Sequence, residues 1–197
     1  LDLVIRETKR CASIIRRLLD FSREKTPEKT YSNLNELVME TVQLIAQPAQ
    51  VNDIEIEVKL DEQLPVIWMD ENLIKQVIMN MLVNAQHAIE SEGHITIRTR
   101  LLAADECPDS VKEPQDMAEV AITDTGCGIS EVDLHRIYDP FFTTKGVGKG
   151  TGLGLSVSHG TIEAHGGTIE VASTVGEGTE FRIYLPIGGT GDQGRNV

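Results

Sequence analysis

A glycine-rich stretch from Asp139 to Ser156 constrains the fold of this 197-residue chain more than any other feature. Its last part, Gly150–Leu155 (GTGLGL), has glycine at alternate positions and leads into a pattern typical of a helix. Glycine accepts positive φ and leaves its N–H groups open to an anion. A helix that begins after such a loop adds unpaired N–H donors and the positive end of its dipole. The stretch therefore indicates a phosphate-binding loop, with a flexible surface loop as the alternative.

The two common phosphate-binding motifs do not fit this stretch. Lys149 is followed by Gly150 and not by Ser or Thr, which excludes a P-loop. Residues 146–154 contain G-x-G-x-x-G in no register, which excludes the dinucleotide-binding fingerprint. Lys145 and Lys149 nevertheless bring positive charge to the stretch, so its role has to be judged together with the neighbouring motifs.

Charge is distributed unevenly along the chain, whose formal net charge is −13. Residues 1–25 carry seven basic and four acidic side chains, whereas the remaining 172 residues carry 11 basic and 27 acidic ones. An acidic body argues against general nucleic-acid binding. Phosphate chemistry in this body therefore needs local cations and a metal ion.

Cysteine usage and hydropathy favour a cytoplasmic setting. The three cysteines form no C-x-x-C pair, and an odd number suits reduced thiols. The sequence has no apolar run that approaches 18 residues and no signal-peptide pattern, so we expect no membrane segment. Because Leu1 lies inside an apparent helix, we expect a longer parent protein, for which the sequence leaves membrane anchoring open.

Residues 1–25 predict one long helix that cannot bury its apolar face alone. They contain no Gly or Pro, and Val4, Cys11 and Leu18 recur seven residues apart. We therefore expect the helix to pair with a second helix and a second subunit, which gives a homodimer, with docking on its own domain as the alternative. Residues 26–32 are expected to form a polar linker.

The rest of the chain predicts an α+β fold. We expect a two-layer α/β sandwich over residues 33–187, with a mixed, mostly antiparallel sheet and helices on one face. Asn33 and Asp70 are expected to cap two of its helices. Residues 103–117 predict an acidic hairpin excursion, and 188–197 a disordered tail. Helices are expected at about 34–47, 71–90, 130–137 and 153–165, and strands at 54–60, 65–68, 94–102, 118–123, 168–173 and 179–185.

Two amides, Asn80 and Asn84, lie one turn apart on the helix predicted at 71–90. Because this helix is otherwise apolar on its inner side, polar groups at its edge need an explanation. One explanation is a structural pair with satisfied hydrogen bonds, and the other is a neutral oxygen ligand for Mg²⁺, which leaves several coordination positions to phosphate oxygens. His87 lies one further turn along the same edge and can meet a phosphate, although a lone histidine is more often structural.

Asp124 ends a predicted central strand and opens the turn Asp124-Thr-Gly-Cys-Gly-Ile129. A carboxylate there can accept a hydrogen bond from the exocyclic amine of adenine, and it repels the oxygen that guanine presents at that place. Gly126 and Gly128 let the backbone pass close to a base, whereas an ordinary Asp-Thr-Gly turn is the alternative. Asp139-Pro-Phe-Phe142 adds two aromatic rings that can anchor a mobile flap.

Together these stretches resemble the Bergerat-type nucleotide-binding domain, most closely that of the sensor histidine kinases of two-component systems. The resemblance covers about residues 30–187, and residues 1–25 look like the second helix of the kinase dimerisation hairpin. The motifs that carry it are Asn80–Ala88 (N box), Asp124–Ile129 (G1 box), Asp139–Lys145 (F box), Gly148–Leu155 (G2 box), His165-Gly-Gly167 and Gly176-x-Gly-Thr-x-Phe181.

The resemblance implies a binding site for ATP and Mg²⁺. Asn84 would ligate the metal, with Asn80 and His87 near the phosphates. Asp124 would read adenine, helped by Thr179 through water. Residues of about 130–149 would form a lid, with Phe141 and Phe142 as its hinge anchors. The other positions that would contact the nucleotide are Gly126, Gly128, Ile129, Thr144, Lys145, Lys149, Gly150, Thr151, Gly152, Leu153, Gly154 and Leu155.

The resemblance also implies a reaction and its partners. The phosphoacceptor of the family is a histidine in a motif like H-E-x-R-x-P, and none of the five histidines here has that context. Its place would lie upstream of Leu1, so the chain is expected to bind ATP without phosphorylating itself. The γ-phosphoryl group would pass to that histidine and then to an aspartate of a response-regulator receiver domain.

Three alternative functions remain. In hydrolytic proteins of the same fold, such as Hsp90, gyrase and the mismatch-repair ATPases, a glutamate that activates water typically stands one turn before the metal-binding Asn. Asn80 occupies that position here, and an amide is no general base, which disfavours a hydrolase. The bundle-type helix at 1–25 disfavours a protein-serine kinase. The intact Asn84, Asp124 and GTGLGL disfavour a degenerate nucleotide-binding scaffold.

Overall fold

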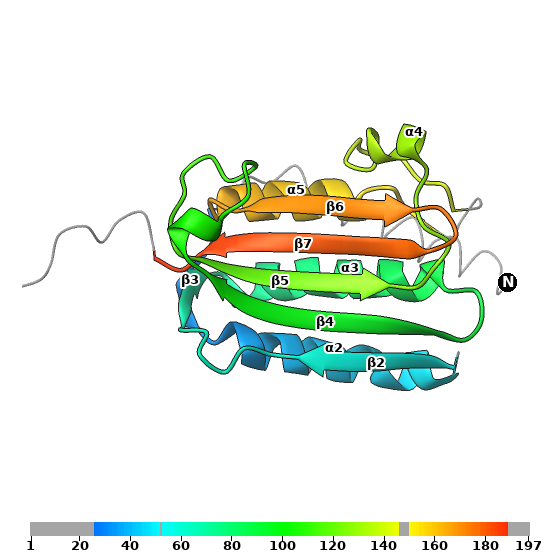
Figure 1. Cartoon of the computed structure of the whole chain (residues 1–197), viewed down its shortest axis with the longest axis horizontal. Helices are drawn as coiled ribbons and strands as arrows, with labels where there is room; N and C mark the ends of the chain where they lie inside the picture. The colour runs from blue at the N-terminus through cyan, green and yellow to red at the C-terminus, as the bar shows by residue number, and fades with distance from the viewer. Residues whose placement is uncertain (1–25, 52, 146–149, 189–197) are drawn as a thin grey trace, which may run out of the picture.

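The computed structural model describes residues 26–51, 53–145 and 150–188. The predicted helix at 1–25, Lys149 and residues 189–197 of the predicted tail lie outside this part of the chain. A five-stranded sheet with the order β2-β4-β5-β7-β6 forms one layer, and helices cover one of its faces (Figure 1). Its strands are β2 (Ile54–Lys59), β4 (Gly93–Leu102), β5 (Met117–Asp124), β6 (Thr168–Thr174) and β7 (Gly178–Pro186).

The sheet is mixed and mostly antiparallel, which confirms the predicted two-layer sandwich. β2 pairs with β4 in parallel, whereas the β4–β5, β5–β7 and β7–β6 pairs are antiparallel. The three long helices lie behind the sheet in Figure 1, and a short fourth one lies beyond β6. These helices are α2 (Leu34–Val51), α3 (Glu71–Ala88), α4 (Glu131–Leu134) and α5 (Gly154–Ala164).

Capping side chains set the starts of α2 and α3, as predicted. Asn33 Oδ1 accepts hydrogen bonds from the N–H groups of Asn35 and Glu36 at 3.0 and 3.3 Å. Asp70 Oδ1 accepts from the N–H groups of Asn72 and Leu73, both at 3.1 Å. These bonds satisfy donors that a helix cannot pair internally, and such a cap is worth about 1 kcal/mol.

The core lies between the sheet and the helices. α3 buries Ile74, Ile78 and Leu82 against it, and the central strand β5 contributes Val120 and Ile122. Each such side chain stabilises the fold by about 1.5–3 kcal/mol relative to exposure. The inner positions of α3 are therefore fixed by burial, and the polar positions of the same helix come to lie at the edge of the core. Within the described ranges, no helix is long and apolar enough to cross a membrane.

The predicted linker at 26–32 is wrong at its C-terminal end. Thr30–Ser32 forms strand β1, which pairs antiparallel with β3 (Ile67–Met69), and Ser32 is buried. Three residues are too few to show an alternating pattern. The pairing partner lies more than 30 positions away, so the strand follows from a tertiary contact and not from local sequence.

Residues 103–116, called here the excursion, connect β4 to β5 and contain only the short 3₁₀ helix η1 (Ala104–Glu106). The excursion folds over one end of the sheet face that carries no helices (Figure 1). Val111 packs there with Leu102, Met117 and Tyr184 in a small second core. Ser110 Oγ also donates a hydrogen bond of 2.7 Å to Glu170 of β6. The excursion is thus held to the sheet by both apolar and polar contacts.

Candidate functional site

The edge of α3 and the glycine-rich stretch meet at Lys145. Lys145 Nζ donates a hydrogen bond of 2.9 Å to Asn84 Oδ1 and lies 3.3 Å from His87 Nδ1. Burial lowers the pKa of the Lys145 ammonium, with an opposing effect of Cys127. Partial burial and the charge of Lys145 lower the pKa of His87. One cation therefore contacts two of the three side chains that the sequence placed on this edge.

Asn80 connects α3 to the start of α5. Its Nδ2 donates a hydrogen bond of 3.1 Å to Ser158 Oγ, which is buried. Gly154 lies against the same amide, because a Cβ added there would approach Asn80 Cγ to 2.9 Å. The close approach of the two helices thus requires glycine at position 154. Ser158 was missed from the sequence, since a lone serine inside a helix carries no signal of its own.

Asp124 ends β5 in a buried position, with 5% of its surface exposed. Its Oδ1 accepts a hydrogen bond of 2.8 Å from the N–H of Gly126. Burial raises the pKa of this carboxyl, and hydrogen bonds from the backbone N–H groups of Gly126 and Thr179 oppose the rise. The carboxylate is therefore fixed in orientation by its own turn.

The turn after Asp124 is clamped between α3 and the β6–β7 turn. A Cβ on Gly126 would come within 2.6 Å of Ala88 Cβ, and one on Gly128, whose φ is +70°, would overlap the carbonyl of Thr174. The Ile129 N–H donates a hydrogen bond of 2.8 Å to Ser173 Oγ. Both glycines are needed for these close approaches, and this wall of the site is tightly packed.

Thr179 and Ser173 complete this wall. The Thr179 hydroxyl lies 2.9 Å from Ser173 Oγ, and Thr179 is the β7 partner of Asp124 in the sheet register. Ser173 Oγ also donates to the Gly178 carbonyl at 2.9 Å. Thr179 was named from the sequence, whereas Ser173, which joins Ile129 to Thr179, was missed because its role depends on the pairing of β6 and β7.

The two ends of the glycine-rich stretch are tied together. The Phe141 N–H donates a hydrogen bond of 2.8 Å to the Gly152 carbonyl, and both residues have positive φ, 69° and 66°. Leu153 is buried, and the N–H of Leu153 donates to Thr151 Oγ1 at 3.4 Å. Gly150 lies beside Thr143, and Leu155 packs against the core.

α5 begins without a capping side chain among the described residues, because its N-cap is Leu153. The first N–H groups of a helix point along its axis and carry partial positive charge. An uncapped helix start after a glycine-rich loop therefore provides donors for an anion. This end of α5 lies next to Asn80, through Gly154.

The two predicted aromatic anchors behave differently. Phe142 packs against the core and lies under Arg136, whose guanidinium carbon is 4.5 Å from the ring centroid. Phe141 is 60% exposed, so its assignment as an anchor is wrong. Its backbone carries the contact to Gly152 and turns the side chain outward. Thr144 is exposed as well.

One buried group at this end of the molecule was not anticipated. The Tyr138 hydroxyl is buried and has no hydrogen-bond partner among the described residues. Its ring lies 4.7 Å from the His159 ring, between centroids. Burial raises the pKa of Tyr138 to about 12, so the hydroxyl stays protonated at physiological pH.

The donor set fits Mg²⁺ only if a ligand supplies most of the oxygens. Asn84 Oδ1 offers one neutral oxygen, and the described residues contain no group of three or more His, Cys, Asp or Glu that could hold a metal ion. Mg²⁺ commonly binds through a few protein oxygens together with substrate phosphates and water. The arrangement therefore suits a metal that arrives with a phosphorylated ligand.

The fold and the arrangement of this site define a nucleotide-binding domain. The sequence profile described as "Histidine kinase-, DNA gyrase B-, and HSP90-like ATPase" matches residues 69–189, which is more than half of the chain. The chain belongs to this family. Its relatives place it with the sensor histidine kinases, so the resemblance inferred from the sequence motifs is confirmed.

Two curated relatives illustrate the similarity. The chain is 41% identical over 180 residues to the sensor kinase CckA of Brucella abortus (strain 2308), a match that covers 90% of this chain and 19% of CckA. It is 38% identical over 193 residues to the signal transduction histidine-protein kinase AtoS of Escherichia coli (strain K12), which covers 98% of this chain and 30% of AtoS. The chain thus spans less than a third of the length of either relative.

Solved structures agree with this placement. The catalytic domain of the histidine kinase ThkA superposes with a TM-score of 0.69 at 31% identity, covering 82% of this chain and 97% of that domain. ThkA in complex with the response regulator protein TrrA superposes with a TM-score of 0.73 at 27% identity, covering 94% of this chain and 49% of the ThkA chain. The predicted fold class is therefore confirmed by comparison as well as by topology.

Proposed function

We propose that the chain is the ATP-binding catalytic domain of a sensor histidine kinase, and that it transfers the γ-phosphoryl group of ATP to a histidine that is not one of the five in this sequence. The observation that carries the choice of a transferase is Asn80. Its amide stands one turn before Asn84 and donates to Ser158. An amide does not take a proton from water, so the position typical of the hydrolytic base holds no base.

The roles proposed for the site residues follow their positions. Asp124 binds the exocyclic amine of adenine, with Gly126, Gly128, Ile129 and Thr179 shaping the wall around it. Asn84 ligates Mg²⁺, which when bound would neutralise charge on the β- and γ-phosphates. Lys145, Lys149 and the backbone of Gly150–Leu155 hold the phosphates, with Asn80 and His87 near them. Thr144 contributes to the nucleotide site, and Phe142 anchors the lid.

In the proposed reaction, no residue of the domain forms a covalent bond with the phosphoryl group. A nitrogen of the acceptor imidazole forms a bond to the γ-phosphorus while the bond from that phosphorus to the bridging oxygen breaks, and ADP leaves with that oxygen. The domain contributes positioning, because aligned reactants avoid a large entropic cost. The uncapped start of α5 and Lys145 support this role, since both direct positive charge toward the same region.

The similarity to histidine kinases also supports proposals for the partners, the domain boundaries and the location of the chain. The ThkA–TrrA complex supports a response-regulator receiver domain as the next phosphate acceptor. We propose that residues 1–25 belong to a dimerisation hairpin followed by a short linker, that residues 33–187 form the catalytic domain, and that this domain works in the cytoplasm, where ATP is available.

The test is phosphotransfer to a separately supplied helical hairpin that bears the acceptor histidine. We expect γ-labelled ATP to give alkali-stable, acid-labile phosphohistidine on the hairpin, with little release of free phosphate. A hairpin in which glutamine replaces the acceptor histidine is the matched control and should stay unlabelled. If the chain released free phosphate from ATP equally fast with and without the hairpin, and the hairpin stayed unlabelled, it would be a hydrolase instead.

A further inference from the structure

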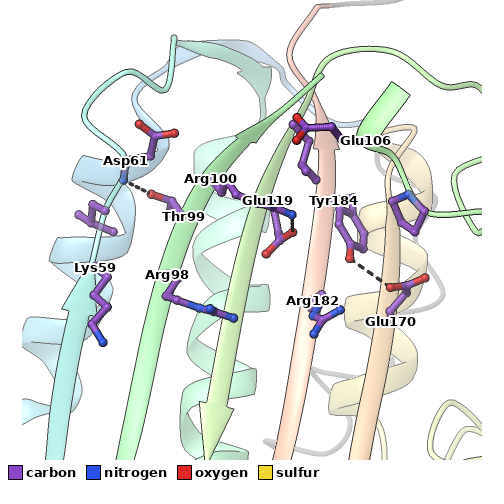
Figure 2. Close-up of a pocket in the computed structure, with 13 residues that line it drawn as sticks. Lys59, Asp61, Arg98, Thr99, Arg100, Glu106, Glu119, Glu170, Arg182 and Tyr184 are labelled. Atoms are coloured by element: carbon purple, nitrogen blue, oxygen red, sulfur yellow. Dashed lines mark hydrogen bonds and ion pairs between the residues drawn. The ribbon is translucent and has the colours of Figure 1, made fainter. Parts of the chain in front are cut away.

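A polar hollow of about 700 Å³ lies on the face of the sheet opposite the helices (Figure 2). It is lined by side chains from all five strands and by the excursion, among them Arg98, Arg100, Glu119, Arg182 and Tyr184. The proposed nucleotide site uses α3, the start of α5 and the loops beyond β5, so it does not include this hollow. The volume lies within the range of small-molecule sites, about 300–1,000 Å³.

The register of the sheet brings cations together in this hollow. Arg98 of β4 and Arg182 of β7 are both paired with Ala121 of the intervening strand β5. Lys59 of β2 is the partner of Arg98 on the other side. Because Ala121 has only a methyl group, the side chains of Arg98 and Arg182 can approach each other across β5, where Glu180 pairs with both of them.

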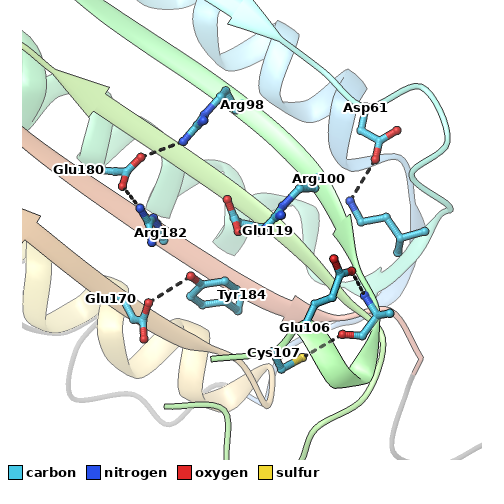
Figure 3. A network of polar contacts seen from close by, with 12 residues as sticks. Asp61, Arg98, Arg100, Glu106, Cys107, Glu119, Glu170, Glu180, Arg182 and Tyr184 are labelled. Carbon is cyan, nitrogen blue, oxygen red and sulfur yellow. Dashed lines mark hydrogen bonds and ion pairs between the residues drawn. The ribbon is translucent and has the colours of Figure 1, made fainter. Parts of the chain in front are cut away.

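Each of the three arginines pairs with an acidic side chain that is less exposed than the arginine itself. Glu180 contacts both Arg98, at 2.9 Å, and Arg182, while Glu119 contacts Arg100 at 3.1 Å (Figure 3). The carboxylate side chains are only 16% and 9% exposed, whereas the three arginine side chains are 44–57% exposed. A molecule that approaches this face therefore meets guanidinium groups first.

The ion pairs use only some of the N–H donors of the arginines. The contacts of Arg98 and Arg100 engage Nη2, one nitrogen of a group that carries five N–H donors in a planar fork. Such forks bind phosphate and carboxylate with paired hydrogen bonds. An anion can thus bind the guanidinium groups while Glu119 and Glu180 keep their partners.

We propose that this hollow is a second binding site, for a small polyanion that carries phosphate or carboxylate groups. The lining also contains Asp61, Glu106 and Glu170, which lie around the arginines and repel an extended polyanion such as nucleic acid (Figure 2). This site is independent of the proposed phosphotransfer.

The test is calorimetric titration of the 197-residue chain with inorganic pyrophosphate and, separately, with citrate, both without Mg²⁺. We expect saturable binding of at least one probe at millimolar concentration. Tighter binding of pyrophosphate would assign the site to phosphate compounds, and tighter binding of citrate to polycarboxylates. Absence of saturable binding for both probes would overturn the proposal.

Variants locate the site. The triple variant Arg98→Gln, Glu180→Gln, Arg182→Gln removes both cations together with the carboxylate that pairs with them, so that this carboxylate is not left without its partners. We expect its affinity for the probe to fall about tenfold or more, because hydrogen bonds to charged groups are the strong ones. Lys75→Gln, on the helix layer, is the matched control and should bind as the unmodified chain does.

Two further variants distinguish binding in the hollow from binding in the nucleotide site. Lys59→Glu changes an exposed side chain and should weaken binding severalfold even if the triple variant fails to fold. Lys145→Gln alters the nucleotide site and should leave probe affinity unchanged. Loss of binding in Lys145→Gln, with unchanged affinity in the triple variant and in Lys59→Glu, would place the anion in the nucleotide site and overturn the proposal.

Discussion

Lys145 Nζ donates a hydrogen bond of 2.9 Å to Asn84 Oδ1, although the two residues are 61 positions apart. The ammonium thereby occupies the oxygen proposed for the metal. A cation and Mg²⁺ cannot share one amide oxygen at bonding distance, because their charges repel. If Asn84 ligates Mg²⁺ as proposed, binding of Mg·ATP requires Lys145 to leave Asn84, and we expect the phosphates of the ligand to become its new partners.

The first prediction concerns the metal dependence of nucleotide binding. Asn84→Ala removes the proposed ligand oxygen, and we expect ATP affinity in the presence of Mg²⁺ to fall by about 1–3 kcal/mol, the scale of a lost interaction with a charged group. Calorimetry with and without Mg²⁺ measures the effect. Asn72→Ala, on the first turn of the same helix, is the control. Full retention of the Mg²⁺ dependence in Asn84→Ala would remove this residue from the metal site.

The second prediction concerns adenine recognition. Asp124→Asn keeps an oxygen for the Gly126 N–H but loses the negative charge. We expect ATP to bind about 1.5–3 kcal/mol more weakly, as for a charge-assisted hydrogen bond. Titration with ATP and GTP also tests specificity, since the amide no longer repels the guanine oxygen. Asp109→Asn, in the exposed excursion, is the control, and equal ATP affinity in both variants would contradict the assignment.

The third prediction compares two glycines of α5. A Cβ at Gly154 would approach Asn80 Cγ to 2.9 Å, whereas nothing lies within 4 Å of a Cβ at Gly160. Gly154→Ala should therefore displace Asn80, lower the free energy of unfolding by about 1–3 kcal/mol and weaken ATP binding. Gly160→Ala should raise stability by about 0.5–1 kcal/mol, because alanine loses less backbone entropy in a helix.

Urea unfolding and ATP titration of both variants check this contrast. The two substitutions are chemically identical and lie in the same helix, so a general effect of alanine on α5 would appear in both. Equal stability changes, or unaltered ATP affinity in Gly154→Ala, would show that the contact with Asn80 does not shape the site.

The fourth prediction concerns His165 and pH. Its Nε2 accepts a hydrogen bond of 3.0 Å from the Asp70 N–H, and its Nδ1 lies 2.7 Å from the Thr161 carbonyl. Since a backbone N–H can only donate, Nε2 carries no proton, Nδ1–H donates to Thr161, and the ring is neutral. Burial lowers the pKa of His165 below its ordinary value of 6.5. The unfolded chain therefore binds more protons, and stability rises with pH in this window.

The stability that neutral His165 contributes is thus fully present above about pH 6.5 and is lost as pH falls through the lower folded pKa. His165→Gln should cost about 1 kcal/mol at neutral pH and flatten the acid side of the profile. Urea unfolding at several pH values measures both effects. The pKa of His87 is also lowered, so His87→Gln measures the separate contribution of His87 to the pH dependence of stability. His135 is exposed, and His135→Gln is the control. An acid slope unchanged in His165→Gln would contradict the prediction.

Local signals predicted local structure well. The caps at Asn33 and Asp70 depend on a side chain and the next three residues, which a sequence displays directly. Strand β1 was missed because its pairing with β3 is not local. Phe141 was misjudged because its positive φ and its backbone contact with Gly152, eleven positions away, are not visible in the local sequence.

The sequence predicted which residues belong to the candidate site better than it predicted the contacts between them. Motif spacing named Asn84 and Lys145, but only the fold brings them within hydrogen-bonding distance. Ser158 and Ser173 carry no sequence signal, since their roles follow from helix contact and strand register. The outer hollow likewise depends on which residues β4 and β7 place beside Ala121.

The hydrogen bond between Phe141 and Gly152 closes the segment between them at its base. The entropy of closing such a loop grows only with the logarithm of its length, so doubling the enclosed segment costs about 0.6 kcal/mol. We therefore expect that residues can be inserted into this segment or removed from it while α5 keeps its place. The length of the segment between Phe141 and Gly152 is in this sense a separate variable of the domain, open to change by evolution or by protein engineering without rebuilding the sandwich.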